Sequence, residues 1–159
     1  MSGERQDLLS RSALGVFRLN GQFLGVAEEL ARPAGLTAAW WQVLGAVLGE
    51  PLPVSGIARA MGITRQSVQR VADLLVERGL AEYRPNPAHR RAKLLAPTVE
   101  GRAAVARIDP GHAAFADRLA EAFGEAELAR AVTLLERLSK VLDQVGPPRG
   151  PAAAPVTEP

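Results

Sequence analysis

The chain has 159 residues, of which 47% are hydrophobic, 4% are aromatic and none is cysteine. This length and apolar content suffice for a buried core, and few aromatics beside abundant alanine favour helices over a β-sandwich. Without cysteine there can be no disulfide, thiolate metal site or thiol-based redox switch. No apolar run approaches the about 18 residues of a membrane span, and the N-terminus lacks a signal-peptide layout, so we expect a soluble, cytoplasmic protein.

The net charge of +2 is modest, but the charge is unevenly distributed. Residues 64–93 hold seven basic and three acidic residues, so this segment carries +4 and the remainder of the chain carries −2. Basic charge concentrated on one segment is typical of a nucleic-acid-binding surface.

The first two predicted elements are helices, over residues 6–31 and from Thr37 to about residue 48. Apolar residues recur at helical spacing in the first: Leu9, Ala13, Phe17, Leu24 and Ala27. Two residues end it: Pro33 and Gly35. Thr37 offers a side-chain oxygen as the N-cap of the second helix. Three residues then predict a break in regular structure: Gly49, Pro51 and Pro53.

A helix, a tight turn and a second helix follow. The short helix covers residues 54–61, and Gly62 lies where the turn requires left-handed backbone angles. Thr64 is a plausible N-cap for the next helix, residues 65–78. Its apolar residues define one buried face: Val68, Val71, Ala72, Leu75 and Val76.

A β-hairpin and further helices complete the chain. Residues 80–84 and 93–96 read as paired strands around the polar, basic tip PNPAHRRA. Thr98 caps a helix from residue 99, which meets a kink or break at Pro110-Gly111 and then resumes to Gly124. A last helix covers about residues 125–144, and the composition of residues 146–159 predicts disorder. The fold class is therefore mostly α with a small β-hairpin.

The residues that carry chemistry lie on the helix after Gly62 and at the hairpin tip. Arginine can hydrogen-bond guanine in pairs, glutamine can do so with adenine, and hydroxyls can reach phosphates. Arginines on a slim hairpin can enter a minor groove, where negative potential is focused. The candidate DNA-binding residues are Thr64, Arg65, Gln66, Ser67, Gln69, Arg70, His89, Arg90 and Arg91. The alternatives are an ordinary solvated helix face and a mobile surface loop.

The sequence resembles the MarR family of winged helix-turn-helix transcriptional regulators, from the first helix to about Gln144. Three segments carry the resemblance in the family's order: GLTAAWWQVL at 35–44, IARAMGITRQSVQRVADLLVERGL at 57–80 and HRRAKLLAPTVEGR at 89–102. It implies one domain over residues 1–145, with dimerisation helices at about 6–31 and 99–144 and a winged helix-turn-helix at about 37–97. Where the family commonly has aspartate before two wing arginines, this chain has His89, which puts the usual wing geometry in doubt.

Many members of that family bind small aromatic or phenolic anions between the dimer base and the winged lobe. The resemblance therefore implies ligand-contacting residues on the first two helices: Phe17, Asn20, Phe23, Trp40 and Trp41. Neighbours on a helix point about 100° apart, so only one of the two tryptophans is expected in the core. Plain core or dimer packing is the alternative for each residue.

We expect a sequence-specific DNA-binding transcriptional regulator that acts as a repressor. It would bind an inverted-repeat operator as a homodimer and be released by a small phenolic or aromatic effector. The alternatives are a sequence-neutral architectural DNA-binding protein and a protein-interaction module whose wing no longer binds DNA. No catalytic arrangement or glycine-rich phosphate loop is present, and the two histidines are isolated, so we expect no enzymatic activity, cofactor or metal.

Overall fold

The computed structural model of the chain describes residues 2–147. It separates into two compact units, residues 1–113 and residues from 114 onward, and each is described by itself. Nearly all of the tail that was predicted to be disordered, residues 148–159, lies outside the described residues.

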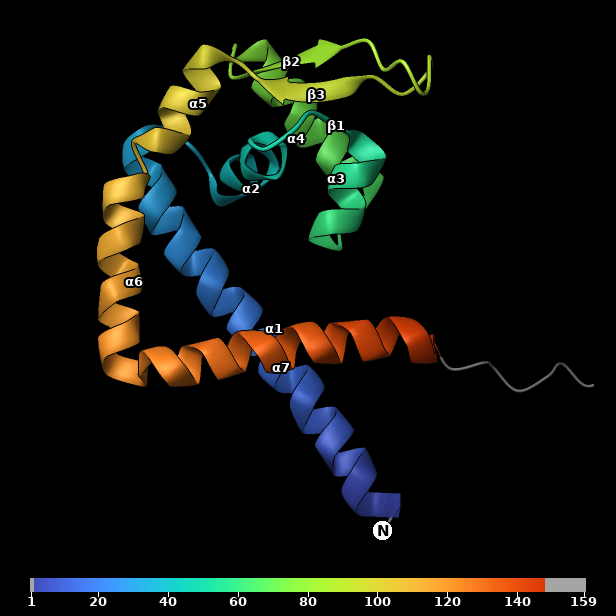
Figure 1. Cartoon of the computed structure of the whole chain (residues 1–159), viewed down its shortest axis with the longest axis vertical. Coiled ribbons are helices and arrows are strands. Elements are labelled where there is room, and N and C mark those ends of the chain that lie inside the picture. The colour runs from blue at the N-terminus through green and yellow to red at the C-terminus, as the bar shows by residue number, and fades with distance from the viewer. Residues whose placement is uncertain (1, 148–159) are drawn as a thin grey trace, which may run out of the picture. The chain divides into compact units, whose positions relative to one another are not determined.

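The first unit contains helices and a small sheet, as predicted (Figure 1). Its elements are α1 (Ser2–Ala31), the short 3-10 helix η1 (Arg32–Ala34), α2 (Ala38–Val47), β1 (Leu52–Pro53), α3 (Val54–Met61), α4 (Arg65–Glu77), β2 (Ala81–Arg84), β3 (Leu94–Pro97), α5 (Val99–Ala106) and the start of α6 (Asp109–Phe123). The rest of α6 and the helix α7 (Glu125–Val145) belong to the second unit.

One aliphatic core holds the helices of the first unit against the sheet. Each of five elements or junctions supplies a fully buried side chain: Leu44 from α2, Ile57 from α3, Leu75 from α4, Leu95 from β3 and Ile108 from the turn after α5. Burying such a side chain stabilises the fold by about 1.5–3 kcal/mol. The core therefore fixes α4 relative to the hairpin that follows it.

The predicted helix ends are confirmed where polar side chains and glycines set them. Thr37, Thr64 and Thr98 each accept a hydrogen bond from a backbone N–H in the first turn of their helix. Gly62 has a φ of 66°, which gives the left-handed turn between α3 and α4.

The interruption predicted at Pro110-Gly111 is present, but it falls slightly earlier in the chain. The break lies at Arg107–Ile108, and Pro110 sits in the first turn of α6. A proline is tolerated there because the first N–H groups of a helix have no intrahelical partner.

The sheet has a third strand that was not predicted. The strand order is β1-β3-β2. Leu95 in the central strand β3 is paired with Leu52 of β1 on one side and with Tyr83 of β2 on the other. The segment around Pro51 and Pro53 was expected to be only a break. A two-residue strand is too short to show alternation, and its proline is tolerated because β1 lies at the sheet edge.

Two helices expose many apolar side chains. On α1 these include Leu8, Leu9, Leu14, Phe17 and Phe23, and Phe17 is 70% exposed. On α7 they include Val132, Leu134, Leu135, Leu138 and Leu142. None of the described helices is sufficiently long and apolar to span a membrane.

The junction between α5 and β2 leaves no room for a side chain at Gly101. A Cβ built there would overlap the backbone carbonyl oxygen of Leu80, whereas one at Gly45 in α2 would meet nothing within 4 Å. We predict that Gly101→Ala lowers the free energy of unfolding by about 1–3 kcal/mol, because the backbone must move. Gly45→Ala, the matched control, should raise it by about 0.5–1 kcal/mol.

Urea titration of both variants at one protein concentration would measure this difference. A Gly101→Ala variant as stable as the wild type would show that α5 does not pack against the Leu80 carbonyl as described.

Candidate nucleic-acid interface

Helix α4 has one buried face and one exposed polar face. Val68, Ala72 and Leu75 are fully buried, and the predicted apolar face is confirmed. The opposite face exposes four of the sequence-predicted DNA-binding residues: Arg65, Gln66, Gln69 and Arg70. Because residues three and four apart share a helix face, these four side chains form a continuous surface.

The side chains of Thr64 and Ser67, at the start of α4, are hydrogen-bonded to each other. The Thr64 hydroxyl oxygen accepts from the Ser67 backbone N–H at 3.2 Å and donates its own hydrogen to the Ser67 hydroxyl at 2.9 Å. Thr64 therefore acts as the N-cap of α4. Ser67 is half-buried and keeps its own hydroxyl hydrogen for another acceptor.

The β2–β3 loop, residues 85–93, forms the wing and is shaped by its backbone and one asparagine. The Asn86 side-chain oxygen accepts from the Ala88 N–H, and its carbonyl accepts from the His89 N–H. The His89 carbonyl accepts from the Ala92 N–H at 3.2 Å. The turns form through these bonds, none of which uses the side chain of residue 89. His89, Arg90 and Arg91 are exposed at its tip.

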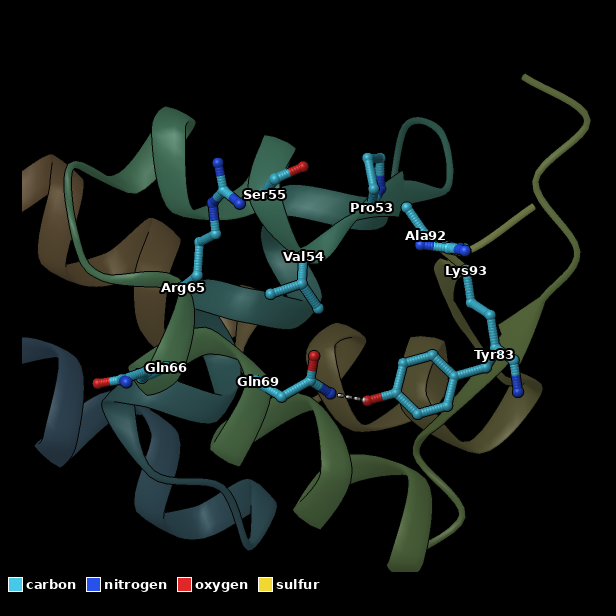
Figure 2. A pocket seen from close by; sticks show the side chains of 10 residues that line it. Pro53, Val54, Ser55, Arg65, Gln66, Gln69, Tyr83, Ala92 and Lys93 are labelled. Carbon is cyan, nitrogen blue, oxygen red and sulfur yellow. Dashed lines mark hydrogen bonds between the residues drawn. The ribbon is translucent and has the colours of Figure 1, made fainter. Parts of the chain in front are cut away.

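A hollow of about 620 Å³ lies between α4 and the wing (Figure 2). It brings three predicted residues of α4, namely Arg65, Gln66 and Gln69, together with Arg91 of the wing. The prediction did not include several other lining residues: Ser55, Tyr83 and Lys93. Arg90 and His89 do not line this hollow, although they lie on the same loop.

The surface around the hollow has an excess of positive charge. Two of the seven basic residues in 64–93 have partners: Arg84 pairs with Glu82 at 2.8 Å, and Arg78 lies 5.7 Å from the ring centre of Trp40. The ion pairs found within residues 2–147 do not include the other five: Arg65, Arg70, Arg90, Arg91 and Lys93. Their charge is therefore available to an external anion such as a phosphate.

Tyr83 links strand β2, which leads into the wing, to α4 through Asp73 and Gln69. Its hydroxyl donates to Asp73 Oδ1 at 2.5 Å and accepts from Gln69 Nε2 at 2.9 Å. Burial, and then the hydrogen bond to the Asp73 carboxylate, raise the pKa of Tyr83 from about 10 to about 12. Sequence analysis missed Tyr83, although its position two residues after the buried Ala81 places it on the same face of β2.

The residues predicted to contact a ligand fall into two groups. Trp40 and Trp41 of α2 both lie half-buried against the core, and the Trp41 ring contacts His112 edge-on at 5.5 Å. The expectation that only one of the two tryptophans would lie in the core is not met, because both are half-buried at its margin. The other three are exposed on α1: Phe17, Asn20 and Phe23.

Of the three exposed residues on α1, Phe17 lies farthest along the helix from the tryptophans. The Trp41 ring contacts His112, and Gly111 beside His112 is close to α1, since a Cβ built there would lie 3.4 Å from the Leu30 side chain. Leu30 is therefore the residue of α1 that lies at the level of Trp41. Phe17 precedes Leu30 by 13 residues, which is about 20 Å of helix. Within residues 2–147 no group of three or more metal-ligating side chains is present.

The fold and the site together define a winged helix-turn-helix DNA-binding protein. Residues 34–92 match the model of the MarR family. An uncharacterised protein of Mycobacterium tuberculosis is 40% identical over 83% of this chain and 92% of its own length. A putative transcriptional regulatory protein for the hcr operon of Thauera aromatica is 30% identical over 87% of this chain and 80% of its own length.

Solved structures of DNA-binding proteins have a similar fold. The transcriptional repressor CouR, bound to a 23-mer DNA duplex, is 28% identical, with a TM-score of 0.70 over 79% of this chain and 89% of its own. BpsR of Bordetella bronchiseptica, whose DNA binding is regulated by 6-hydroxynicotinic acid, is 25% identical, with a TM-score of 0.70 over 81% of this chain and 98% of its own. The chain belongs to the MarR family of DNA-binding transcription regulators, whose members are not enzymes.

Tyr83 is the only tyrosine in the chain, so its ionisation can be followed directly by ultraviolet absorbance. We predict a midpoint near pH 12 in the folded protein and near 10 in the chain unfolded by urea. Since the folded-state pKa is the higher one, this group's contribution to stability is complete below pH 10 and is lost as the pH rises toward 12.

The Asp73→Asn variant should titrate between these two values, because burial remains while the negative charge is removed. A folded wild-type protein, checked by circular dichroism, whose tyrosine titrated near 10 would contradict the described link between α4 and the wing.

Proposed function

We propose that the chain represses transcription as a homodimer that occupies an inverted-repeat operator. The observation that carries this proposal is the exposed polar face of α4, which opens into a cationic hollow shared with the wing. An α-helix fits the major groove of B-form DNA, and a positive surface beside it neutralises the flanking phosphates.

The residues divide into two kinds of contact. Arg65, Gln66, Gln69 and Arg70 would face base edges from the first turns of α4, and Ser67 would donate to a phosphate. Arg90 and Arg91 would extend from the wing into the adjacent minor groove, with His89 beside them. The position of Arg91 at the rim of the hollow supports a contact on the same duplex that α4 reads.

The apolar surfaces of α1 and α7 support the association of two copies. These helices expose large side chains at a density that would be costly in water if nothing covered them. A second copy supplies the same surface, and a two-fold axis then presents two α4 helices to one duplex. Half-sites one helical turn apart, about 34–36 Å, would match such a pair.

Regulation by a small aromatic effector is the third part of the proposal. The relative BpsR, whose DNA binding is regulated by 6-hydroxynicotinic acid, supports it. An effector shifts a conformational equilibrium only by binding the two states unequally. Because Phe17 lies about 20 Å from the level of Trp41, one small molecule could contact these two residues together only if a second protomer supplied one of them.

A wing arginine in contact with phosphate or the minor groove contributes to the salt dependence of binding. We predict that Arg91→Ala weakens binding to every duplex and reduces the slope of log K against log salt by about 0.9, the value for one phosphate contact. Arg32→Ala in η1 removes the same charge from an exposed position that belongs to neither the polar face of α4, the wing nor the proposed association surface, and is the matched control.

Fluorescence anisotropy at several salt concentrations would measure both slopes. An unchanged slope for Arg91→Ala would contradict the wing assignment. In the same titrations the wild type should bind a selected sequence about 10³-fold more tightly than random duplex, whereas a sequence-neutral protein would bind both alike.

Dimer formation can be tested by substituting a residue that does not contribute to the core of a single copy. Phe17 is 70% exposed, so Phe17→Asp should leave the fold of one copy intact but place a carboxylate in the association surface. We predict that the variant becomes monomeric in light scattering and loses cooperative protection of two half-sites in DNA footprinting. Val99→Asp, at an apolar residue that is 81% exposed at the start of α5, should remain dimeric. A dimeric Phe17→Asp protein would count against this surface.

A further inference from the structure

The two glutamines on the exposed face of α4 are in different situations. Gln69 Nε2 donates to Asp73 Oδ1 at 2.9 Å and to the Tyr83 hydroxyl at 2.9 Å. Gln66 has no side-chain hydrogen bond among those found within residues 2–147. Figure 2 shows the Gln69 nitrogen turned toward Tyr83 and its oxygen turned away.

The orientation of the Gln69 amide follows from the chemistry of its neighbours. An ionised carboxylate only accepts hydrogen bonds, so the group that faces Asp73 must be the amide nitrogen. The Tyr83 hydroxyl gives its single hydrogen to Asp73, so it can only accept from Gln69. Both amide hydrogens are therefore used, and Oε1 is the only polar atom of Gln69 left for another partner.

Paired recognition of adenine by glutamine requires a free donor as well as a free acceptor, because adenine presents N7 as an acceptor and N6 as a donor. Gln66 has both. Gln69 has only the acceptor, and freeing its nitrogen would break two hydrogen bonds, one of them to a charged carboxylate, in order to form one with N7. The amide is therefore expected to stay bound when DNA is present.

We infer that Gln69 is a specificity-determining residue that reads DNA as an acceptor only. It would select a base with a major-groove amino group, which is adenine N6 or cytosine N4, and would not distinguish the two. Guanine O6 and thymine O4 would face the Gln69 oxygen as acceptors and be rejected. This inference rests on the proposed function, since it requires that α4 enter the major groove.

The inference also accounts for an acidic residue on a surface that otherwise favours anions. Asp73 lies on the exposed face of α4, where it lines a second, shallow hollow together with Gln66, Gln69 and Arg70. Its carboxylate reduces attraction to every duplex, but it accepts from both Gln69 and Tyr83 and so holds the amide in one orientation.

Selection of bound DNA from a random pool, followed by deep sequencing, tests the inference. The proteins are the full-length wild type, Gln69→Ala, Gln66→Ala, Tyr83→Phe and the double variant Asp73→Ala with Tyr83→Phe. Glu77→Ala is the charge control, because it removes one carboxylate from the exposed side of α4 without touching Gln69. Circular dichroism confirms that each variant is folded.

For the wild type we expect one position per half-site where adenine and cytosine are accepted within about threefold of each other and guanine and thymine are about tenfold weaker. Gln69→Ala should abolish the discrimination at that position, and Gln66→Ala should alter a different one. The double variant frees the amide and should favour adenine over cytosine by about fivefold or more, with Tyr83→Phe between it and the wild type. Glu77→Ala should leave the ratio unchanged.

Two results would overturn the inference while leaving the proposed function intact: an enriched inverted repeat with no position that depends on Gln69, or a Gln69-dependent position that favours adenine equally in the wild type and the double variant. Enrichment of no sequence at all would refute the proposed function and, with it, the inference.

Discussion

The geometry of the site depends on the aliphatic core that joins α4 to the sheet. Leu75 on the buried face of α4 and Leu95 in the central strand are both fully buried in this core. The wing joins β2 to that central strand. Because protein cores are packed about as densely as organic crystals, the base of the wing cannot shift without disturbing the core. The close contact of Gly101 with the Leu80 carbonyl extends the same constraint to α5.

A polar link complements the core on the exposed side. The Tyr83 hydroxyl joins β2 to α4 through Asp73, and the same carboxylate holds Gln69. A residue of the wing strand therefore determines how a residue of the helix presents its hydrogen-bonding groups. The core sets where α4 lies relative to the wing, and this link sets part of what α4 can read.

Most of the fold could be predicted from the sequence because local signals agree with tertiary packing. The threonine caps at 37, 64 and 98 and the turn glycine at 62 act within a few residues, and the apolar face of α4 has helical spacing. Strand β1 could not be predicted, because two residues carry no periodicity and pair only through a distant partner. The exposed residues of α4 and the wing could be named for the same local reasons.

The identity of a side chain was sufficient to propose Gln66 and Gln69 as equivalent readers of adenine, and the structure separates them. One amide hydrogen of Gln69 goes to Asp73, four residues along the same helix. The other goes to Tyr83, fourteen residues after Gln69 in sequence, which meets α4 only because the core brings β2 against it. Sequence spacing along one helix shows which side chains share a face. It cannot show which of their hydrogen-bonding atoms are already used by a neighbouring strand. Recognition by such a helix is therefore a property of the packed lobe, and substitutions in the wing strand can alter base preference without touching DNA.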